Sequence, residues 1–328
     1  MSTTQVARGG VSPLMPVAAA VAIALVAVLA GVRTGDVEVD VDQAVYRDTL
    51  VQMRAGDGYY DAHRDALIAK EGAPPRSVRA IRPPTLFLVL RWFPESSWRY
   101  LVGLAYLAIL LAAWRLGDPY GRYGGVIAVV LAGFWVVAAS SFLYLHAELW
   151  GAPLFLWGAL EVRRGRDARA ASLIAAATLV RELYGLGLLI GLVVRKQRAP
   201  WIAATLAVIA LGIVHVLLAQ DVLSPAGTQA ALGNEPYTLS LVLTILSPGD
   251  NLGSWIVGIP MLVAGVGGLM RARRSDPAAA FLLPFCAVMI PAAVVATRAY
   301  WSLAWGPTVA AFAGSGLTSA SRLRREDG

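Results

Sequence analysis

Residues 36–84 read DVEVDVDQAVYRDTLVQMRAGDGYYDAHRDALIAKEGAPPRSVRAIRPP, by far the longest polar stretch in an otherwise apolar chain. An apolar run over residues 13–32 precedes this stretch, and further apolar runs follow it as far as residue 318. A long polar segment between apolar runs is typical of a loop at one face of a membrane. The sequence therefore predicts a long first loop, residues 33–97, between the first and second membrane helices.

The composition of the chain is that of a helical membrane protein. Of its 328 residues, 57% are hydrophobic and 15% are charged, and the mean hydropathy is +0.62. Soluble domains carry about 25% charged residues. The net charge of +7 falls between the apolar runs, so lipid headgroups and topology explain it better than nucleic acid does. The single cysteine, Cys286, excludes a disulfide framework.

The apolar runs predict an all-α fold with about ten transmembrane helices in one domain over residues 1–328. The first run has about 20 residues, which at about 1.5 Å per residue matches a bilayer core of about 30 Å. The remaining runs are residues 98–114, 124–144, 149–161, 170–180, 184–194, 201–219, 252–270, 278–296 and 302–318.

Positive charge predicts the orientation, because short cytoplasmic connections are enriched in Lys and Arg. With the N-terminus in the cytoplasm, every short Arg-rich connection and the C-terminus fall inside the cell. The acids then concentrate outside, in the first loop, at Glu148 and Glu182, and in a second outer loop over residues 220–251. We expect a multi-pass plasma-membrane protein with both termini cytoplasmic and its functional site extracytoplasmic.

The runs over residues 170–180 and 184–194 are too short to cross a bilayer, at roughly 16 Å each. One continuous helix through both would bury Arg181 and Glu182 at mid-membrane, at about 2.5–3.5 kcal/mol for the arginine. We therefore predict two short helices with these charges at their tip, facing a polar cavity. Residues 85–93 and 238–246 are also short, and we expect them to lie along the outer interface.

Asp40 and Asp42 form an acidic Asp-Val-Asp triplet directly after the first helix. Glycosyl transfer to a hydroxyl group needs a base for the acceptor proton, and a carboxylate can serve. Two carboxylates one residue apart can also hold a divalent cation together with phosphate oxygens. A solvated acidic turn has the same pattern, so the triplet alone decides nothing.

Aromatic and proline residues follow the triplet in a distinctive order. The order is Tyr46, then Gly56-Asp57-Gly58-Tyr59-Tyr60, then Arg82-Pro83-Pro84 before an apolar segment. Over residues 36–90 this order resembles the first outer loop of the GT-C glycosyltransferases, which are integral-membrane enzymes that use polyprenyl-phosphate sugars. The resemblance implies that Asp42 is the catalytic base, with Asp40 second. Gln43 replaces the usual acid after the aspartate, so a metal ion (Mg²⁺ or Mn²⁺, on Asp40 and Asp42) is optional and no cofactor is required.

The resemblance also implies a second site acid, Glu148, and arginines for the donor phosphate, since guanidinium groups bind phosphate oxygens bidentately. Each candidate has a structural alternative, such as an internal ion pair, a polar turn or an aromatic at the membrane interface. The candidate substrate-binding residues are Arg181, Glu182, Arg298, Arg82, Tyr46, Tyr59, Tyr60, His146 and Tyr300.

The resulting hypothesis is a glycosyltransferase that moves a sugar from a polyprenyl-phosphate donor to a glycan, glycolipid or protein acceptor outside the membrane. Mannose and arabinose are common donor sugars in the family, and no residue here chooses between them. A transporter and a non-catalytic subunit that binds polyprenyl phosphate remain as alternatives. The chain has no GxxxxGK[ST] motif and no zinc-ligand spacing, so we expect neither ATP hydrolysis nor a zinc site.

Overall fold

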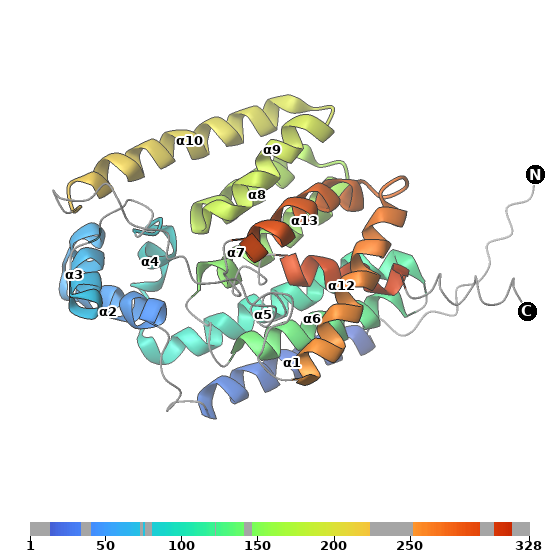
Figure 1. Ribbon diagram of the computed structural model, residues 1–328, viewed down its shortest axis with the longest axis horizontal. Coiled ribbons are helices and arrows are strands. Elements are labelled where there is room, and N and C mark those ends of the chain that lie inside the picture. The colour runs from blue at the N-terminus through green and yellow to red at the C-terminus, as the bar shows by residue number, and fades with distance from the viewer. Residues whose placement is uncertain are drawn as a thin grey trace, which may run out of the picture.

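The computed structural model describes residues 14–33, 41–72, 75, 81–121, 123–140, 146–223, 252–295 and 305–316, and every regular element in these ranges is helical (Figure 1). This confirms the all-α class for the described part of the chain. The helices are α1 (Leu14–Arg33), α2 (Val41–Ala55), α3 (Tyr59–Glu71), α4 (Thr85–Leu90), α5 (Glu95–Gly117), η2 (Asp118–Tyr120), α6 (Gly124–Ser140), α7 (Ala147–Arg163), α8 (Asp167–Val180), η3 (Glu182–Tyr184), α9 (Gly185–Val194), α10 (Arg198–Gln220), α12 (Leu252–Ala272), α13 (Pro277–Val295) and a helix over residues 305–316.

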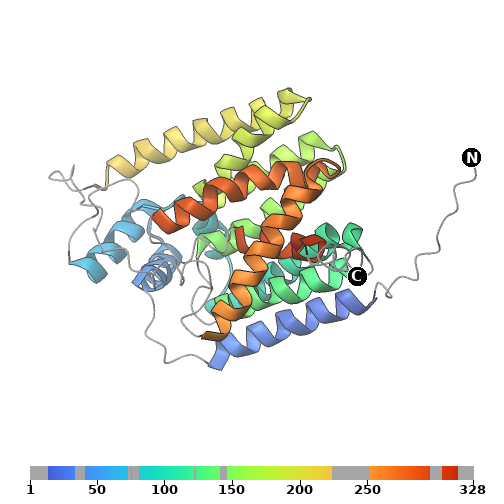
Figure 2. The same ribbon diagram turned by 45° about the vertical axis from the view of Figure 1, so that its right-hand side comes forward.

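The long helices form a bundle in which most axes are roughly aligned and neighbouring helices such as α1 and α5 run in opposite directions (Figure 1). In Figure 1, α1, α5 and α6 lie side by side along the lower edge and α10 runs along the upper edge, and Figure 2 shows the same arrangement after a 45° turn. Large aromatic side chains fill the space between helices, including Trp135 of α6, Phe155 of α7 and Phe285 of α13. The bundle therefore has a continuous apolar core.

The polar first loop forms a separate helical cap at one end of this bundle. Its helices α2, α3 and α4 pack on a second core that includes Leu50, Ala62, Leu86, Phe87 and Trp98. The cap occupies the left of Figure 1, away from the end where α1 begins. The six residues of α4 lie within residues 85–93, which the sequence predicts to be too short to cross a membrane, whereas residues 238–246 lie outside the described part.

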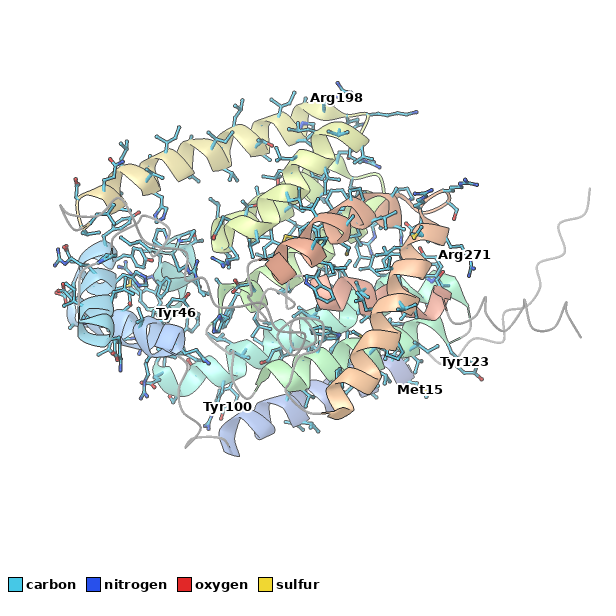
Figure 3. The ribbon with its side chains drawn as sticks, viewed as in Figure 1. Met15, Tyr46, Tyr100, Tyr123, Arg198 and Arg271 are labelled. Atoms are coloured by element: carbon cyan, nitrogen blue, oxygen red, sulfur yellow. The ribbon has the colours of Figure 1, made fainter. Side chains whose placement is uncertain are left out.

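The arginine-rich turns gather at the end of the bundle opposite the cap. Figure 3 labels Met15, Tyr123, Arg198 and Arg271 on the right of the molecule and Tyr46 of the cap on the left. This is the grouping expected if these turns share one side of a membrane.

Acidic side chains neutralise two of the arginines at this basic end. Asp276 accepts hydrogen bonds from Nε and Nη2 of Arg163 at 3.1 and 2.6 Å, and also from the Tyr120 hydroxyl. Asp167 accepts from Arg195 Nε at 2.6 Å and from the Trp201 indole at 3.1 Å. Burial alone would raise the pKa of Asp167, but these hydrogen bonds lower it below its usual value.

Helices α8 and α9 form the short hairpin that the sequence predicts. The chain leaves α8 at Arg181 in an extended conformation (φ −150°, ψ 117°), makes the single turn η3 and returns as α9. The ion pair between Arg195 and Asp167 shows the return, because it joins the end of α9 to the start of α8. With 14 and 10 residues, the two helices are about 21 and 15 Å long.

Two helices among the described residues are both long and apolar enough to cross a membrane, where the sequence predicts about ten. They are residues Glu95–Tyr120 and α10, and five further apolar helices of 10–17 residues are shorter. The α8–α9 hairpin accounts for two of the ten, because its helices have only 14 and 10 residues. The apolar side chains of α10 are largely exposed, with Leu206 at 60%, Ile213 at 56% and Leu217 at 57%.

Candidate functional site

The tip of the α8–α9 hairpin meets the helical cap and the start of α7. Five side chains that contact one another converge there from segments far apart in the sequence. They are Tyr46 of α2, Arg82 before α4, Glu148 of α7, and Arg181 and Glu182 at the hairpin tip.

The centre of this candidate site is a buried ion pair. Nε of Arg181 donates to Oε1 of Glu148 at 2.5 Å, and each side chain is only 2% exposed. The other carboxylate oxygen of Glu148, Oε2, lies 3.8 Å from Nδ1 of His146. A charge this deeply buried is tolerated only with a partner. Glu148 therefore holds the Arg181 guanidinium in a defined orientation.

Tyr184 fixes the position of Glu148 relative to the hairpin. Its hydroxyl donates to the backbone carbonyl oxygen of Glu148 at 2.7 Å. Its ring lies against Gly151 of α7 so closely that a Cβ at this glycine would stand 2.3 Å from a ring carbon. Glycine at position 151 is therefore needed for the hairpin tip to approach α7.

Glu182 is the exposed acid of the site. Its Oε1 atom accepts from Nη1 of Arg181 at 2.6 Å and lies 3.9 Å from Nη1 of Arg82, and 54% of the side chain is exposed. One oxygen thus lies between two guanidinium groups. The site pairs two arginines with one buried and one accessible carboxylate.

Two tyrosines of the cap hold Arg82. Nε of Arg82 donates to the Tyr46 hydroxyl at 3.0 Å, and the Tyr59 hydroxyl donates to the Arg82 carbonyl oxygen at 2.5 Å. Burial raises the pKa of the Tyr59 phenol well above its usual value, so Tyr59 remains a proton donor at neutral pH. Tyr59 is therefore a buried support for Arg82 rather than an aromatic at the membrane interface.

An aromatic layer lies beneath Tyr46 and Tyr59. The ring of His63 stacks on both tyrosines, at 6.2 and 5.5 Å between centroids, and contacts Phe87 at 5.7 Å. Nδ1 of His63 is 3.0 Å from the Thr49 hydroxyl. No sequence motif singles out His63, because its partners come from other helices.

Tyr60 has a different place from its neighbour. Its hydroxyl lies 3.1 Å from Nδ1 of His215 in α10, and Nε2 of His215 lies 3.2 Å from the Ile81 carbonyl oxygen. Tyr60 therefore joins the cap to α10. His215 thus connects α10 both to α3 and to the segment before α4.

The structure thus brings together most of the candidate residues that it describes. Asp42 lies in the first turn of α2, four residues before Tyr46. Asp40, Arg298 and Tyr300 lie outside the described residues. Within the described ranges, no group of three His, Cys, Asp or Glu side chains is arranged to hold a metal ion.

The chain matches no protein-family model, no curated protein and no solved structure in the comparisons. Any function must therefore be argued from the geometry of the site itself.

Proposed function

We propose that this protein is an integral-membrane glycosyltransferase that moves a sugar from a polyprenyl-phosphate donor to an acceptor on the extracytoplasmic face. One observation carries the proposal: Arg82 and Arg181 converge at the hairpin tip beneath the cap, with Glu148 orienting the buried arginine. The two guanidinium groups, which both pair with the exposed Glu182 carboxylate, have the charge and the N–H donors to bind a phosphate group.

The proposed membrane arrangement has about ten helices. Each of the ten apolar runs corresponds to a helix, from α1 to the helix over residues 305–316. The apolar surface of α10 supports contact with lipid, since its 23 residues extend over about 35 Å and its exposed side chains are aliphatic. The Arg-rich end is then cytoplasmic and the cap extracytoplasmic, by the distribution of positive charge.

In this proposal the arginines stabilise the departing phosphate. When the bond between the sugar carbon and the phosphate oxygen breaks, the electron pair stays on that oxygen and its negative charge increases. Positive groups held in place before the reaction stabilise such a charge most effectively. Arg181 meets this condition through Glu148, and Arg82 meets it through Tyr46 and Tyr59.

Asp42 is the proposed base that takes the proton of the acceptor hydroxyl. Helical periodicity puts position 42 on the same stripe of α2 as Tyr46, Thr49 and Met53, which are all buried toward the interior of the cap. The proposed base is thus on the helix that also supplies Tyr46. Bond formation to the acceptor oxygen and proton transfer to Asp42 complete the reaction.

A transporter is the weaker alternative. Transport predicts charged residues along a path that reaches both faces. In the described residues the charges cluster at the two ends of the bundle, and at the basic end Glu161, Asp167 and Asp276 pair with four of the arginines. This distribution favours a site that opens toward one face only.

The test is to incubate the purified protein in lipid with a panel of polyprenyl-phosphate sugars and measure which donor is consumed. Arg82→Met should reduce consumption at least about 100-fold, because a positioned charge at the departing phosphate is lost. Arg64→Met is the matched control, since Arg64 lies on α3 of the same cap and pairs with Asp61 and Asp65. Binding without consumption of any donor would favour a non-catalytic subunit, and neither binding nor consumption would refute the proposal.

A further inference from the structure

The carboxylate of Glu182 lies where a bound phosphate oxygen would have to lie. Its Oε1 atom is 2.6 Å from Nη1 of Arg181 and 3.9 Å from Nη1 of Arg82. Guanidinium groups direct their N–H donors in a fixed plane. The Glu182 carboxylate therefore competes with any anion bound by both arginines, because the two need the same N–H donors.

The two acids that contact Arg181 differ in how easily they can leave. Glu148 is buried, and its backbone is held by the Tyr184 hydroxyl, so its departure would leave a buried charge without a partner. Glu182 is 54% exposed, and water can replace its arginine partners when it turns outward. Exchange of Glu182 for a ligand is therefore the less costly way to open the site.

We propose that Glu182 is a displaceable stand-in for the phosphate of the ligand. It occupies the anion position while the site is empty, turns outward when a phosphate binds, and returns as the phosphate leaves. The inference rests on the proposed function, in which Arg82 and Arg181 bind the phosphate of the lipid donor, and it adds the way in which that site is kept closed and emptied.

Charge balance supports this exchange. With Glu182 in place, the two arginines face two carboxylates and their charges cancel. With Glu182 outward, Arg82, Arg181 and Glu148 together carry one positive charge, which matches a phosphodiester donor. The phosphomonoester left after sugar transfer carries more negative charge, about −1.5 to −2, and would bind more tightly. A returning carboxylate opposes that tight binding and promotes product release.

The experiment measures phosphate affinity in the full-length protein, in nanodiscs of phosphatidylcholine. The probes are decaprenyl phosphate and the soluble monoester phenyl phosphate, titrated into wild type, Glu182→Gln and Glu95→Gln. Glu95 is the matched control because it is 43% exposed and pairs with Arg47 at 2.8 Å, so its substitution removes an equal charge from a similar ion pair. Glu182→Gln should bind both probes about tenfold more tightly than wild type, since a charge-assisted hydrogen bond no longer has to be broken. Glu95→Gln should stay within about twofold of wild type, because distant surface charges are screened.

The outcomes separate this inference from the proposed function. If wild type binds decaprenyl phosphate but Glu182→Gln binds no more tightly than Glu95→Gln, the stand-in role is wrong and the lipid-phosphate site remains. If phenyl phosphate alone binds, and binds more tightly to Glu182→Gln, the stand-in role holds and the lipid donor is wrong. If neither probe binds any of the three proteins, both proposals fail.

Discussion

Replacement of Arg181 by Met tests whether the buried ion pair is the element that organises the site. The substitution removes the guanidinium group, keeps most of the side-chain volume and leaves the Glu148 carboxylate buried without its charged partner. Removing one partner from a buried pair costs about 3–5 kcal/mol in the free energy of unfolding. Glu148→Gln should cost less, about 1–3 kcal/mol, because Arg181 keeps Glu182 as a charged partner.

The double variant Arg181→Met/Glu148→Gln decides between a true ion pair and two independent effects. It removes both charges, so we expect it to unfold at nearly the same free energy as Glu148→Gln alone. This outcome corresponds to a coupling energy of about 3–5 kcal/mol between the two side chains, equal to the cost of Arg181→Met alone.

The assay is equilibrium unfolding of the wild type, both single variants and the double variant in mixed micelles. Arg64→Met is the control for loss of an arginine, and it should change the free energy of unfolding by less than about 0.5 kcal/mol because its ion pairs are exposed. A cost below about 1 kcal/mol for Arg181→Met, or single-variant costs that add within about 0.5 kcal/mol, would refute the reasoning.

Four further outcomes are expected. Asp42→Asn should lower the rate of donor consumption by about 10²–10⁴ without changing the unfolding free energy, and an unchanged initial rate would remove Asp42 as the base. Tyr46→Phe deletes the hydrogen bond from Arg82 and should weaken phenyl phosphate binding by about fivefold in a titration, corresponding to about 1 kcal/mol. Asp276→Asn should destabilise the protein by about 3 kcal/mol in the same unfolding assay, since it breaks a bidentate and largely buried pair. Because the folded-state pKa of Asp167 is lowered, its stabilising contribution is complete above its ordinary pKa of about 4 and is lost as the pH falls through the lowered value. In Asp167→Asn, the unfolding free energy should therefore depend less on pH below about pH 4 than it does in the wild type.

The hairpin could be predicted from sequence because its signal is local. Arg181 and Glu182 interrupt an apolar region. One continuous helix through this region would bury both charges at mid-membrane, which would be costly, so two short helices are expected. The same length argument predicts that residues 85–93 are too short to cross a membrane. Local energetic conflicts of this kind can be recognised in a single sequence, because they need no knowledge of the neighbouring helices.

The pairing within the site could not be predicted, because it joins residues far apart in the chain. Arg82, Glu148 and Arg181 were each candidates, but their separations carry no signal that one arginine is buried on Glu148. His63 belongs to no sequence motif, because its partner Thr49 lies in the preceding helix. Tyr184 looked like the first residue of an apolar run, yet its hydroxyl binds the Glu148 backbone.

The rule that places acids outside the membrane was incomplete at the basic end. Glu161, Asp167 and Asp276 all lie among the arginine-rich turns. Arg163 explains one case, since it donates to the last carbonyl groups of α5 and needs a counterion beside them. Asp276 supplies that counterion and also accepts from the Ala278 backbone N–H at the start of α13. These acids serve helix ends, which a count of charges per connection does not register.

The lengths of α8 and α9 set the depth at which the Arg181 guanidinium sits, measured from the basic end. The Asp167–Arg195 pair anchors the base of the hairpin, so the 14 residues of α8 determine how far the tip extends toward the cap. One added or deleted turn would shift that tip by about 5.4 Å. Arg181 would then miss Glu148 even though every side chain of the site was still present. One extra turn in each of α8 and α9 would therefore disrupt the site more than the loss of any single contact in it.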